Sequence, residues 1–295
     1  MEQPKNESVP PPFRCGMAVL VGRTNAGKST LLNALVGTKV SIVTPKPQTT
    51  RETPQGVVNR PEGQIVFVDT PGFFKTHASK LVDSLHQRAR AALKDVDVIV
   101  HVADPSRPLG PEDEMVLEAL RGLPQPKILC LSKKDLKRRP HRKAWVPHFP
   151  GYADVVDVSA VTESNLKKLC RAILPHLPTG AALYPPDQLS NVHRDFQIGE
   201  IIREQVYLLT DEEVPYRTSI EVDSVADSTS QKGEPILDIK AAIVAASDRY
   251  QRMLIGAEGR KIKQIGTAAR EELEKTFAKK VFLDLDVIVG KWMPK

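Results

Sequence analysis

Cysteine and aromatic residues are scarce in this 295-residue chain, which holds 3 cysteines and 5% aromatic residues. The cysteines, at positions 15, 130 and 170, are too few and too far apart for a disulfide framework or a Cys-x-x-Cys metal site. The seven histidines form no His-Glu-x-x-His or other metal-binding spacing. We therefore expect a reduced, cytoplasmic protein in which Cys130, inside the apolar run KILCLS, is a small buried hydrophobic residue.

Long hydrophobic runs are also missing, because no uncharged apolar stretch reaches the roughly 18 residues of a membrane-spanning helix. The first twelve residues, MEQPKNESVPPP, lack the apolar core of a signal peptide and predict a disordered leader at 1–12. The chain is 41% apolar and 26% charged, which is ordinary for globular proteins. Its length suggests about two domains of roughly 150 residues each.

Positive charge is concentrated in the first part of the chain. Residues 1–189 hold 26 Lys and Arg against 18 Asp and Glu, whereas residues 190–295 hold 16 against 18. Much of the excess comes from the run KKDLKRRPHRK at 133–143, in which seven of eleven residues are basic. Such a run is either a solvated loop or a patch that contacts phosphates, and both interpretations stay open here.

Short β-branched runs alternate with amphipathic segments of helical length in a first domain at 13–176. This alternation predicts βαβ units and a doubly wound, mostly parallel α/β sheet. An antiparallel edge strand is expected at 56–60. The other predicted strands are 15–21, 65–69, 96–102, 127–131 and 155–158. The predicted helices are 28–36, 79–93, 111–121 and 162–174.

A proline-rich segment interrupts this pattern, so we predict a linker at 177–193 and a smaller α+β domain at 194–295. The predicted order in the second domain is helix, strand, strand, a Gly-x-x-Gly turn, helix and strand. A strand is expected at 236–246 and a charged amphipathic helix at 260–276. In the last strand, alternating apolar residues share one face. They are Val281, Leu283, Leu285, Val287 and Val289.

A complete Gly-x-x-x-x-Gly-Lys-Ser motif at 22–29 follows a predicted strand and opens a helix, as in P-loop NTPases. Its glycines let successive N–H groups turn towards phosphates, and the helix N-terminus adds partial positive charge. Lys28 is the candidate for reaching the β- and γ-phosphates, and Ser29 the candidate Mg²⁺ ligand. The other candidate nucleotide contacts in this motif are Gly22, Asn25, Ala26, Gly27 and Thr30.

The segment DTPG, from Asp69 to Gly72, provides a second phosphate motif. Asp69 is expected on the Mg²⁺ side, and the Gly72 N–H is placed to sense the γ-phosphate. The proline-punctuated loop at 45–54 is predicted to be irregular and suits a switch whose threonine binds Mg²⁺ when the γ-phosphate is present. Thr49 and Thr50 are both candidates, and a flexible loop with incidental threonines is the alternative.

The segment SKKD, beginning at Ser132, follows a predicted strand where a base-reading motif is expected. The Asp135 carboxylate can accept hydrogen bonds from guanine N1 and N2, and the Lys133 stem can cover one face of the base. Ser132 stands where GTPases usually carry Asn or Thr, so we expect weaker affinity with guanine selectivity retained. Ser159 and Ala160 are the candidates for a backbone N–H to guanine O6.

Hydrolysis is expected to be slow, because Phe73 stands where some GTPases carry a glutamine that orients the attacking water. The Asn25 side chain either coordinates a monovalent cation beside the phosphates or stabilises the loop. We therefore hypothesise Mg²⁺-dependent, K⁺-stimulated GTP hydrolysis with Lys28, Asn25 and Gly72 as catalytic candidates.

The Gly256–Gly259 turn, GAEG, opens a basic helix, and the surrounding element order is that of a KH domain of the prokaryotic topology. Its glycines would admit a single-stranded RNA backbone, while the carboxylate of Glu258 opposes it. Ile243, Ile262 and Ile265 form either a base groove or core. The candidate RNA contacts are Gly256, Ala257, Glu258, Gly259, Arg260, Lys261 and Lys263.

Together these segments resemble the Era family of bacterial ribosome-associated GTPases over residues 13–292. The resemblance rests on GRTNAGKS, PKPQTTRE, DTPGF, SKKD and SA, followed by IIREQVYLLTDEEVPY, MLIGAEGRKIKQIGTAAREELE and FLDLDVIVGKW. It implies a P-loop GTPase domain with a type II KH domain, binding GTP, GDP and 16S rRNA near its 3′ end during small-subunit assembly. It also implies peripheral contact with the inner face of the membrane, and we expect a monomer.

Two other functions remain as alternatives. One is a nucleotide-gated RNA-binding scaffold with negligible turnover, which Phe73 and Ser132 suggest. The other is a tRNA-modifying GTPase of the TrmE type, which shares the GRxNAGKS motif. The second is disfavoured because that family inserts its GTPase domain within a longer chain and carries a C-terminal catalytic cysteine.

Overall fold

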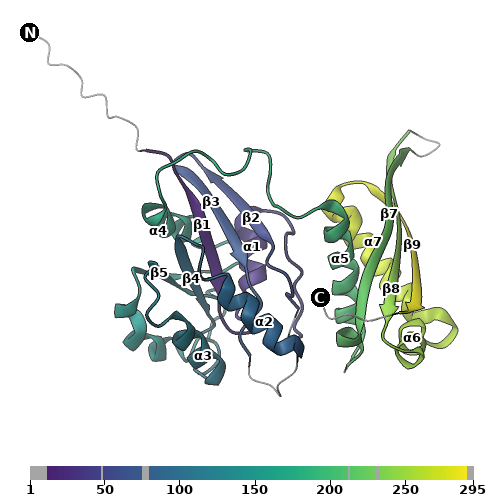
Figure 1. Cartoon of the computed structure of the whole chain (residues 1–295), viewed down its shortest axis with the longest axis horizontal. Coiled ribbons are helices and arrows are strands. Elements are labelled where there is room, and N and C mark those ends of the chain that lie inside the picture. Colours follow the sequence, from purple (N-terminus) through teal and green to yellow (C-terminus); the bar gives the residue numbers. More distant parts are fainter. Residues whose placement is uncertain (1–11, 48, 75–79, 212, 230–232, 291–295) are drawn as a thin grey trace, which may run out of the picture.

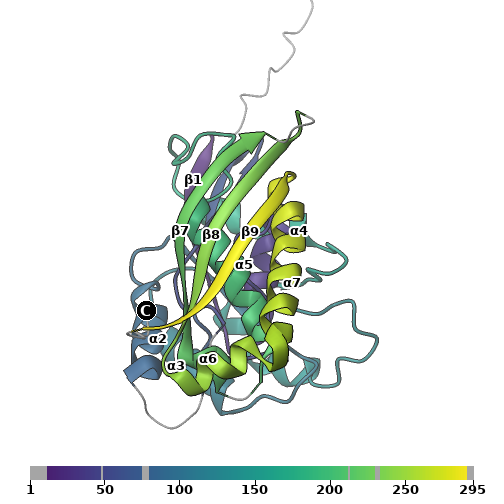
Figure 2. The same ribbon diagram turned by 90° about the vertical axis from the view of Figure 1, so that its right-hand side faces the viewer.

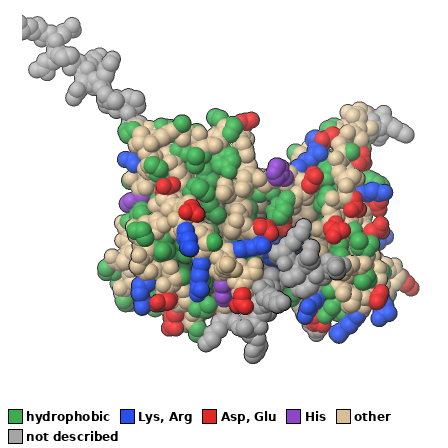
Figure 3. All heavy atoms as spheres, in the orientation of Figure 1, with side chains coloured by type: hydrophobic (Ala, Val, Ile, Leu, Met, Phe, Trp, Pro, Cys, Tyr) green, Lys and Arg blue, Asp and Glu red, His purple; other side chains and the backbone are tan. Residues whose placement is uncertain are grey.

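The computed structural model describes residues 12–47, 49–74, 80–211, 213–229 and 233–290, with the backbone alone at 80–82 (Figure 1). Most of the predicted leader therefore lies outside the described residues. Two domains stand side by side, joined by one crossing segment, and the space-filling view shows a notch between them (Figure 3). Within the described ranges, no helix is both long enough and apolar enough to span a membrane.

The first domain is built on a six-stranded sheet in the order β2-β3-β1-β4-β5-β6. All neighbours pair in parallel except β2, which runs antiparallel to β3 at the edge. The predicted doubly wound α/β fold and its antiparallel edge strand are thus confirmed. The strands are β1 (Arg14–Val21), β2 (Gln55–Arg60), β3 (Gly63–Asp69), β4 (Val98–Ala103), β5 (Lys127–Leu131) and β6 (Asp154–Asp157).

Helices cover both faces of this sheet. Helix α4 begins later than predicted, because Glu163 and Asn165 adopt positive φ values of 53° and 64° that a right-handed helix does not allow. The helices are α1 (Lys28–Val36), α2 (Lys80–Ala91), α3 (Pro111–Leu120) and α4 (Leu166–Ile173), with 3₁₀ segments η1 (Arg142–Gly151) and η2 (Leu174–His176).

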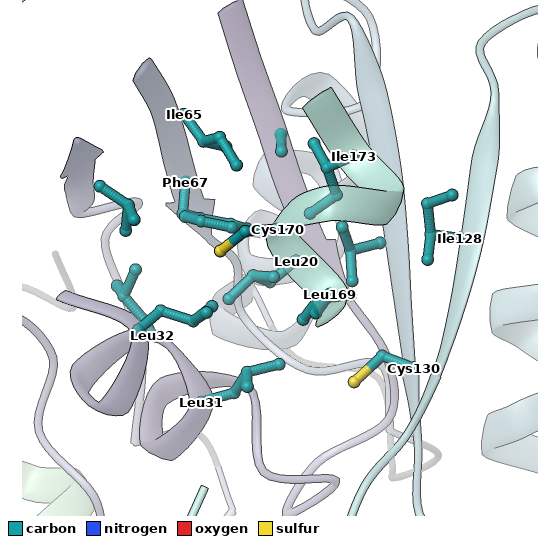
Figure 4. Close-up of a cluster of buried hydrophobic side chains, with 14 of the residues drawn as sticks. Leu20, Leu31, Leu32, Ile65, Phe67, Ile128, Cys130, Leu169, Cys170 and Ile173 are labelled. Carbon is teal, nitrogen blue, oxygen red and sulfur yellow. The ribbon is translucent and has the colours of Figure 1, made fainter. Parts of the chain in front are cut away.

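The main core fills the space between the sheet and helices α1 and α4 (Figure 4). Leu20, Phe67 and Ile128 project from the strands and are fully buried. Cys130 also lies in this core, as predicted, and burial raises the pKa of its thiol to about 12. A second cluster around Phe73 packs under α2 and α3 on the opposite face.

The predicted linker follows the edge of the sheet. Gln64, fully buried on β3, accepts hydrogen bonds from the Leu183 and Tyr184 N–H groups at 2.8 and 2.9 Å. Further along, the Val57 N–H donates to the Leu189 carbonyl at 2.8 Å. The segment thereby covers edge-strand groups that would otherwise be open to pairing with another chain.

The second domain has a three-stranded sheet in the order β7-β8-β9, with β7 antiparallel and β9 parallel to β8 (Figure 2). Its helices pack on one face, and α5 lies on the side towards the first domain (Figure 1). Its elements are α5 (Arg194–Leu209), η3 (Val214–Arg217), β7 (Thr218–Thr229), β8 (Pro235–Ala245), α6 (Asp248–Ile255), η4 (Ala257–Gly259), α7 (Arg260–Phe277) and β9 (Lys280–Val289).

One sequence interpretation of the second domain needs correction. Helix α6 was not predicted, because it is short and Leu254 is its one buried residue, which leaves no apolar periodicity to recognise. Val289 lies on the same face of β9 as Val281, as predicted, although 44% of its surface is exposed at the strand end. Ile243 and Ile265 are fully buried and belong to the core.

Candidate functional site

The phosphate loop connects β1 to α1 in a conformation that its sequence makes possible. Gly27 has φ 101° and Asn25 has φ 57°, both in the left-handed region. At Gly22, a Cβ atom would lie 2.3 Å from the Val102 carbonyl oxygen, so any other residue would push the loop off β4. Helix α1 begins at Lys28, directly after the loop, so the N–H groups of its first turn point towards the loop.

Backbone carbonyls of the phosphate loop hold the Lys28 side chain. Its ammonium group donates to the carbonyls of Gly22 and Arg23 at 3.1 and 3.0 Å, and only 6% of the residue is exposed. Burial lowers the pKa of Lys28 to about 8, against the opposing charges of Asp69 and Glu112. A nucleotide phosphate would replace weak carbonyl partners with full negative charge.

Ser29, Thr50 and Asp69 converge on one point beside the loop. The Ser29 hydroxyl donates to Asp69 Oδ2 at 2.6 Å and lies 3.0 Å from the Thr50 hydroxyl. The second Asp69 oxygen, Oδ1, is buried and has no hydrogen-bond partner among the described residues. Burial raises the pKa of Asp69, with Lys28 and Ser29 opposing it. Two hydroxyls and an unsatisfied carboxylate are donors that fit Mg²⁺.

The two candidate threonines of the switch loop are separated by their surroundings. Thr49 is 8% exposed, and its hydroxyl donates to the Lys46 carbonyl at 2.7 Å and contacts the Thr44 hydroxyl at 2.6 Å. Thr50 instead lies against Ser29 at the metal side. The geometry therefore favours Thr50 as the metal ligand.

Gly72 packs directly on the phosphate loop. A Cβ atom there would lie 2.7 Å from Thr24 Cα and 3.0 Å from Lys28 Nζ. The next residue, Phe73, exchanges backbone hydrogen bonds with Gly22 and Thr24 at 3.1 and 3.0 Å. Its side chain is fully buried, so it cannot orient a water in the site.

Asn25 links the phosphate loop to the switch loop, because its side-chain amide nitrogen donates to the Pro45 carbonyl at 2.7 Å. The loop-stabilising role considered for Asn25 is therefore present. The side-chain oxygen of Asn25 takes no part in this bond. The pocket that these loops enclose has a volume of about 360 Å³ and is lined by Lys28, Thr50 and Gly72 among others.

A separate pocket of about 160 Å³ lies where the base is expected, lined by Gly27, Thr30, Lys133, Asp135 and Ala160 among others. The Ser159 hydroxyl donates to Asp135 Oδ1 at 2.6 Å and holds the carboxylate. Lys133 is fixed by a 2.7 Å ion pair with Asp104, a buried residue that the sequence analysis did not identify. The sequence could have indicated Asp104 only through its position directly after β4, at the carboxyl edge of the sheet.

Ser132 ties the base-reading segment to the phosphate loop. Its hydroxyl lies 2.7 Å from the Ala26 carbonyl and 3.0 Å from the Ala103 carbonyl, and the residue is 8% exposed. A single hydroxyl proton serves both carbonyls, whereas an amide would offer two. The unusual serine therefore keeps the connection with one donor fewer.

The basic run is partly neutralised within the first domain. Arg139 and Arg142 both pair with Asp157, at 2.6 and 2.7 Å. Partial burial would raise the pKa of Asp157, but its bonds to Arg142 and Arg139 outweigh this and hold the pKa below its usual value. These two arginines therefore have a structural role.

The Gly-x-x-Gly turn has the backbone that its glycines predict, with φ 70° at Gly256 and 71° at Gly259. Glu258 also has a positive φ of 54° and lies 3.9 Å from Arg260 in an exposed ion pair. Lys261 is engaged elsewhere, since its ammonium donates to the Leu209 carbonyl at 3.0 Å. The other candidate RNA contacts in this segment are Ala257 and Lys263, both exposed.

Comparison with known proteins agrees with both halves of this arrangement. The sequence model of 50S ribosome-binding GTPases matches residues 17–133, and that of the KH domain matches residues 222–293. GTPase Era of Halothermothrix orenii is 37% identical over 289 residues, which is 96% of each chain. The chain belongs to the GTPase Era family. It is therefore a GTPase, and the TrmE-type alternative is set aside.

Two solved Era structures are similar over the whole length. One is Era in complex with MgGDPNP and nucleotides 1506–1542 of 16S ribosomal RNA, with a TM-score of 0.85 and 34% identity. The other is a variant of Aquifex aeolicus Era bound to GDP·AlF4⁻, with a TM-score of 0.84 and 34% identity. Each comparison covers 94% of both chains. The likeness thus includes the domain arrangement and not only the two separate folds.

Proposed function

We propose that this GTPase is a switch that binds Mg²⁺·GTP at the phosphate loop and 16S rRNA near its 3′ end through the KH domain, acting in small-subunit assembly. The observation that carries the nucleotide half is the convergence of Ser29, Thr50 and Asp69 beside the buried ammonium of Lys28. The RNA half is supported by the related Era complex and by the exposed turn at Gly256–Gly259.

In this proposal the phosphates lie along the loop N–H groups, with Lys28 between the β- and γ-phosphates. Ser29 and Thr50 would hold Mg²⁺ directly, with Asp69 on the same side. A bound Mg²⁺ neutralises charge on the phosphate oxygens. Gly72 packs close to Lys28, and its N–H would contact the γ-phosphate. Loss of that phosphate would then release both Gly72 and Thr50.

Guanine is proposed to occupy the pocket beside Asp135. Its N1 and N2 hydrogens would bond to the Asp135 carboxylate, which Ser159 already orients. The stem of Lys133, fixed by Asp104, would cover one face of the base, and the Ala160 N–H would meet O6. Adenine offers an acceptor at N1 and no N2 donor, so Asp135 would repel it.

Hydrolysis is proposed to be slow and stimulated by K⁺ held by the Asn25 carbonyl oxygen. Phe73 is buried and has no group that could orient water, so hydrolysis must be accelerated in another way. A K⁺ beside the phosphates would supply positive charge to the transition state. Multiple-turnover phosphate release should be faster in K⁺ than in matched Na⁺ buffer, and Asn25→Ala should remove the difference. Equal rates in the two buffers would exclude stimulation of hydrolysis by K⁺. Undetectable turnover with and without small subunits would favour the scaffold alternative.

The KH half is proposed to contact RNA phosphates through Arg260, Lys263 and the backbone of the Gly-x-x-Gly turn. The resemblance to the family also supports a cytoplasmic location with peripheral membrane contact. Crosslinking GTP-loaded protein to small-subunit RNA and sequencing the bound fragments tests the RNA assignment. The expected fragments cluster near the 3′ end of 16S rRNA, and an even spread over the subunit would contradict it.

A further inference from the structure

Helix α5 of the KH domain lies against the switch loop and supplies a buried arginine to it. Arg203 is 4% exposed and donates to the Thr49 carbonyl at 2.7 Å. The same side chain forms two bonds to Glu200, at 2.7 and 2.6 Å, and lies over the Tyr207 ring with its guanidinium carbon 5.3 Å from the centroid. Its position is therefore fixed from within α5.

The atom that Arg203 holds belongs to the peptide group that leads into Thr50. A peptide group is planar, so the Thr49 carbonyl and the Thr50 nitrogen move together. Thr50 in turn lies 3.0 Å from Ser29 at the proposed Mg²⁺ site. When the Thr50 backbone moves away from that site, the Thr49 carbonyl moves with it, and the buried guanidinium of Arg203 loses one of its acceptors while it keeps Glu200.

The C-terminal end of α5 connects the same loop to the candidate RNA turn. Helices end in carbonyls without partners inside the helix. Here the carbonyl of Thr210 accepts a hydrogen bond from Lys46 of the switch loop. The neighbouring carbonyl of Leu209 accepts one from Lys261, just after the Gly-x-x-Gly turn, at 3.0 Å. One helix end thus contacts a lysine from each functional segment.

A third connection joins the segment between α1 and the switch loop to the helix that follows the turn. Lys39 lies within 2.5 Å of both Glu204 on α5 and Glu272 on α7. Glu204 is 4% exposed and also accepts the Val43 N–H at 2.8 Å. Switch loop, α5 and α7 therefore form one packed and hydrogen-bonded unit.

We propose that Arg203 is a positioning residue that couples the nucleotide site to the RNA site. It stabilises the switch loop with Thr50 at the metal side only while α5 is docked, so both sites share one equilibrium. This inference rests on the proposed function and adds the contact through which it is regulated. The competing explanation is that Arg203 only packs the two domains together.

The coupling is measured as a ratio of RNA dissociation constants. Full-length protein is titrated with an RNA of the 3′-terminal 16S segment, once with GDP and once with Mg·GDPNP. We expect tighter binding with Mg·GDPNP and a ratio within the roughly 5- to 150-fold range of allosteric coupling. By linkage, the RNA must change the ratio of GDP and GDPNP affinities by the same factor.

Arg203→Lys keeps a charge beside Glu200, but one ammonium cannot span both Glu200 oxygens and the Thr49 carbonyl. We expect this variant to lower the coupling ratio about tenfold, the value of one charge-assisted hydrogen bond. Arg194→Lys is the matched control, because Arg194 lies in the first turn of the same helix and pairs with Asp227, at 2.6 Å. Its ratio should equal that of the wild type.

Lys46→Met removes the second contact without leaving a buried charge, and it is measured if Arg203→Lys does not fold. It too should lower the ratio. A wild-type ratio of one, or an unchanged ratio in the folded coupling variants, overturns the inference while RNA binding itself stands. Absence of RNA binding in every nucleotide state overturns the proposed function as well.

Discussion

The hydroxyl oxygens of Ser29 and Thr50 lie 3.0 Å apart, although the two residues come from the phosphate loop and from the irregular switch loop. Asp69 completes the group by accepting the Ser29 proton at 2.6 Å. The switch loop is therefore folded onto the metal side of the site. Thr49, its neighbour, is instead occupied by bonds within its own loop.

Thr50→Ala should remove a metal ligand and with it the preference for triphosphate. We expect GTP hydrolysis at saturating nucleotide to fall roughly five- to thirtyfold, since the loss of one hydroxyl ligand costs about 1 to 2 kcal/mol. Thr49→Ala is the matched control and should retain most of the rate. Phosphate release as a function of Mg²⁺ concentration measures both. Equal losses in the two variants would contradict the assignment.

Lys28 gives the nucleotide affinity a pH dependence. Its pKa is lowered to about 8 by burial, and bound phosphates would raise it again. Below pH 8 the ammonium is already charged, whereas above it binding must take up a proton. If only the charged form binds, GDP affinity falls about tenfold between pH 7 and pH 9.

The control for that measurement is Lys28→Met, which should bind GDP weakly and with a smaller pH dependence over the same range. Titration of guanine itself affects both proteins equally, so the difference between them isolates Lys28. Calorimetry at several pH values provides the data. A wild-type affinity that stays constant from pH 7 to pH 9 would show that the pKa of Lys28 lies outside this range.

Ser132→Ala should weaken guanine-nucleotide binding by disconnecting the base pocket from the phosphate loop. The lost hydroxyl leaves the buried carbonyls of Ala26 and Ala103 without this donor, which costs about 1 kcal/mol or roughly fivefold in affinity. Ser164→Ala is a suitable control, since its hydroxyl accepts a hydrogen bond from the exposed Lys134 and has no contact with the phosphate loop among the described residues. GDP dissociation constants decide the matter, and identical values for both variants would refute the role.

Glu258→Lys should tighten RNA binding, because it replaces an exposed carboxylate in the candidate phosphate clamp with a cation. The change in affinity is up to about fivefold, as for other exposed charge pairs. The logarithmic salt dependence should steepen by roughly 0.7 for each phosphate gained. Glu258→Gln should fall between the two, and weaker binding of the lysine variant would place RNA elsewhere.

Much of the first domain could be predicted from sequence, because its strands are buried on both faces and are continuous apolar runs. The strand at 127–131 and the helix at 28–36 appear at the predicted positions. Helix α4 begins later than predicted, because the local backbone at Glu163 and Asn165 is not helical. Element ends depend on caps and neighbours more than on periodicity.

The parts of the site that could not be predicted depend on contacts between distant segments. Thr49 and Thr50 have the same chemistry, and only their neighbours distinguish them. Lys261 was predicted to contact RNA, yet it bonds to the end of α5. Arg203 lies in the segment IIREQVYLLTDEEVPY, but no role was predicted for it, because its partner across the domains is a backbone carbonyl. Sequence patterns indicate the spacing of residues along the chain, but they do not indicate contacts between residues that lie far apart in the sequence.

The central claim is that Lys28 and Asp135 together hold a guanine nucleotide. Displacement of labelled GDP by unlabelled GTP and ATP, with wild type and Asp135→Ala side by side, tests it most directly. A site built to hydrogen-bond one base rejects another strongly, so ATP should compete at least about a hundredfold less well than GTP on the wild type. The variant should lose most of that preference. Equal displacement by ATP and GTP on the wild-type protein would contradict the account.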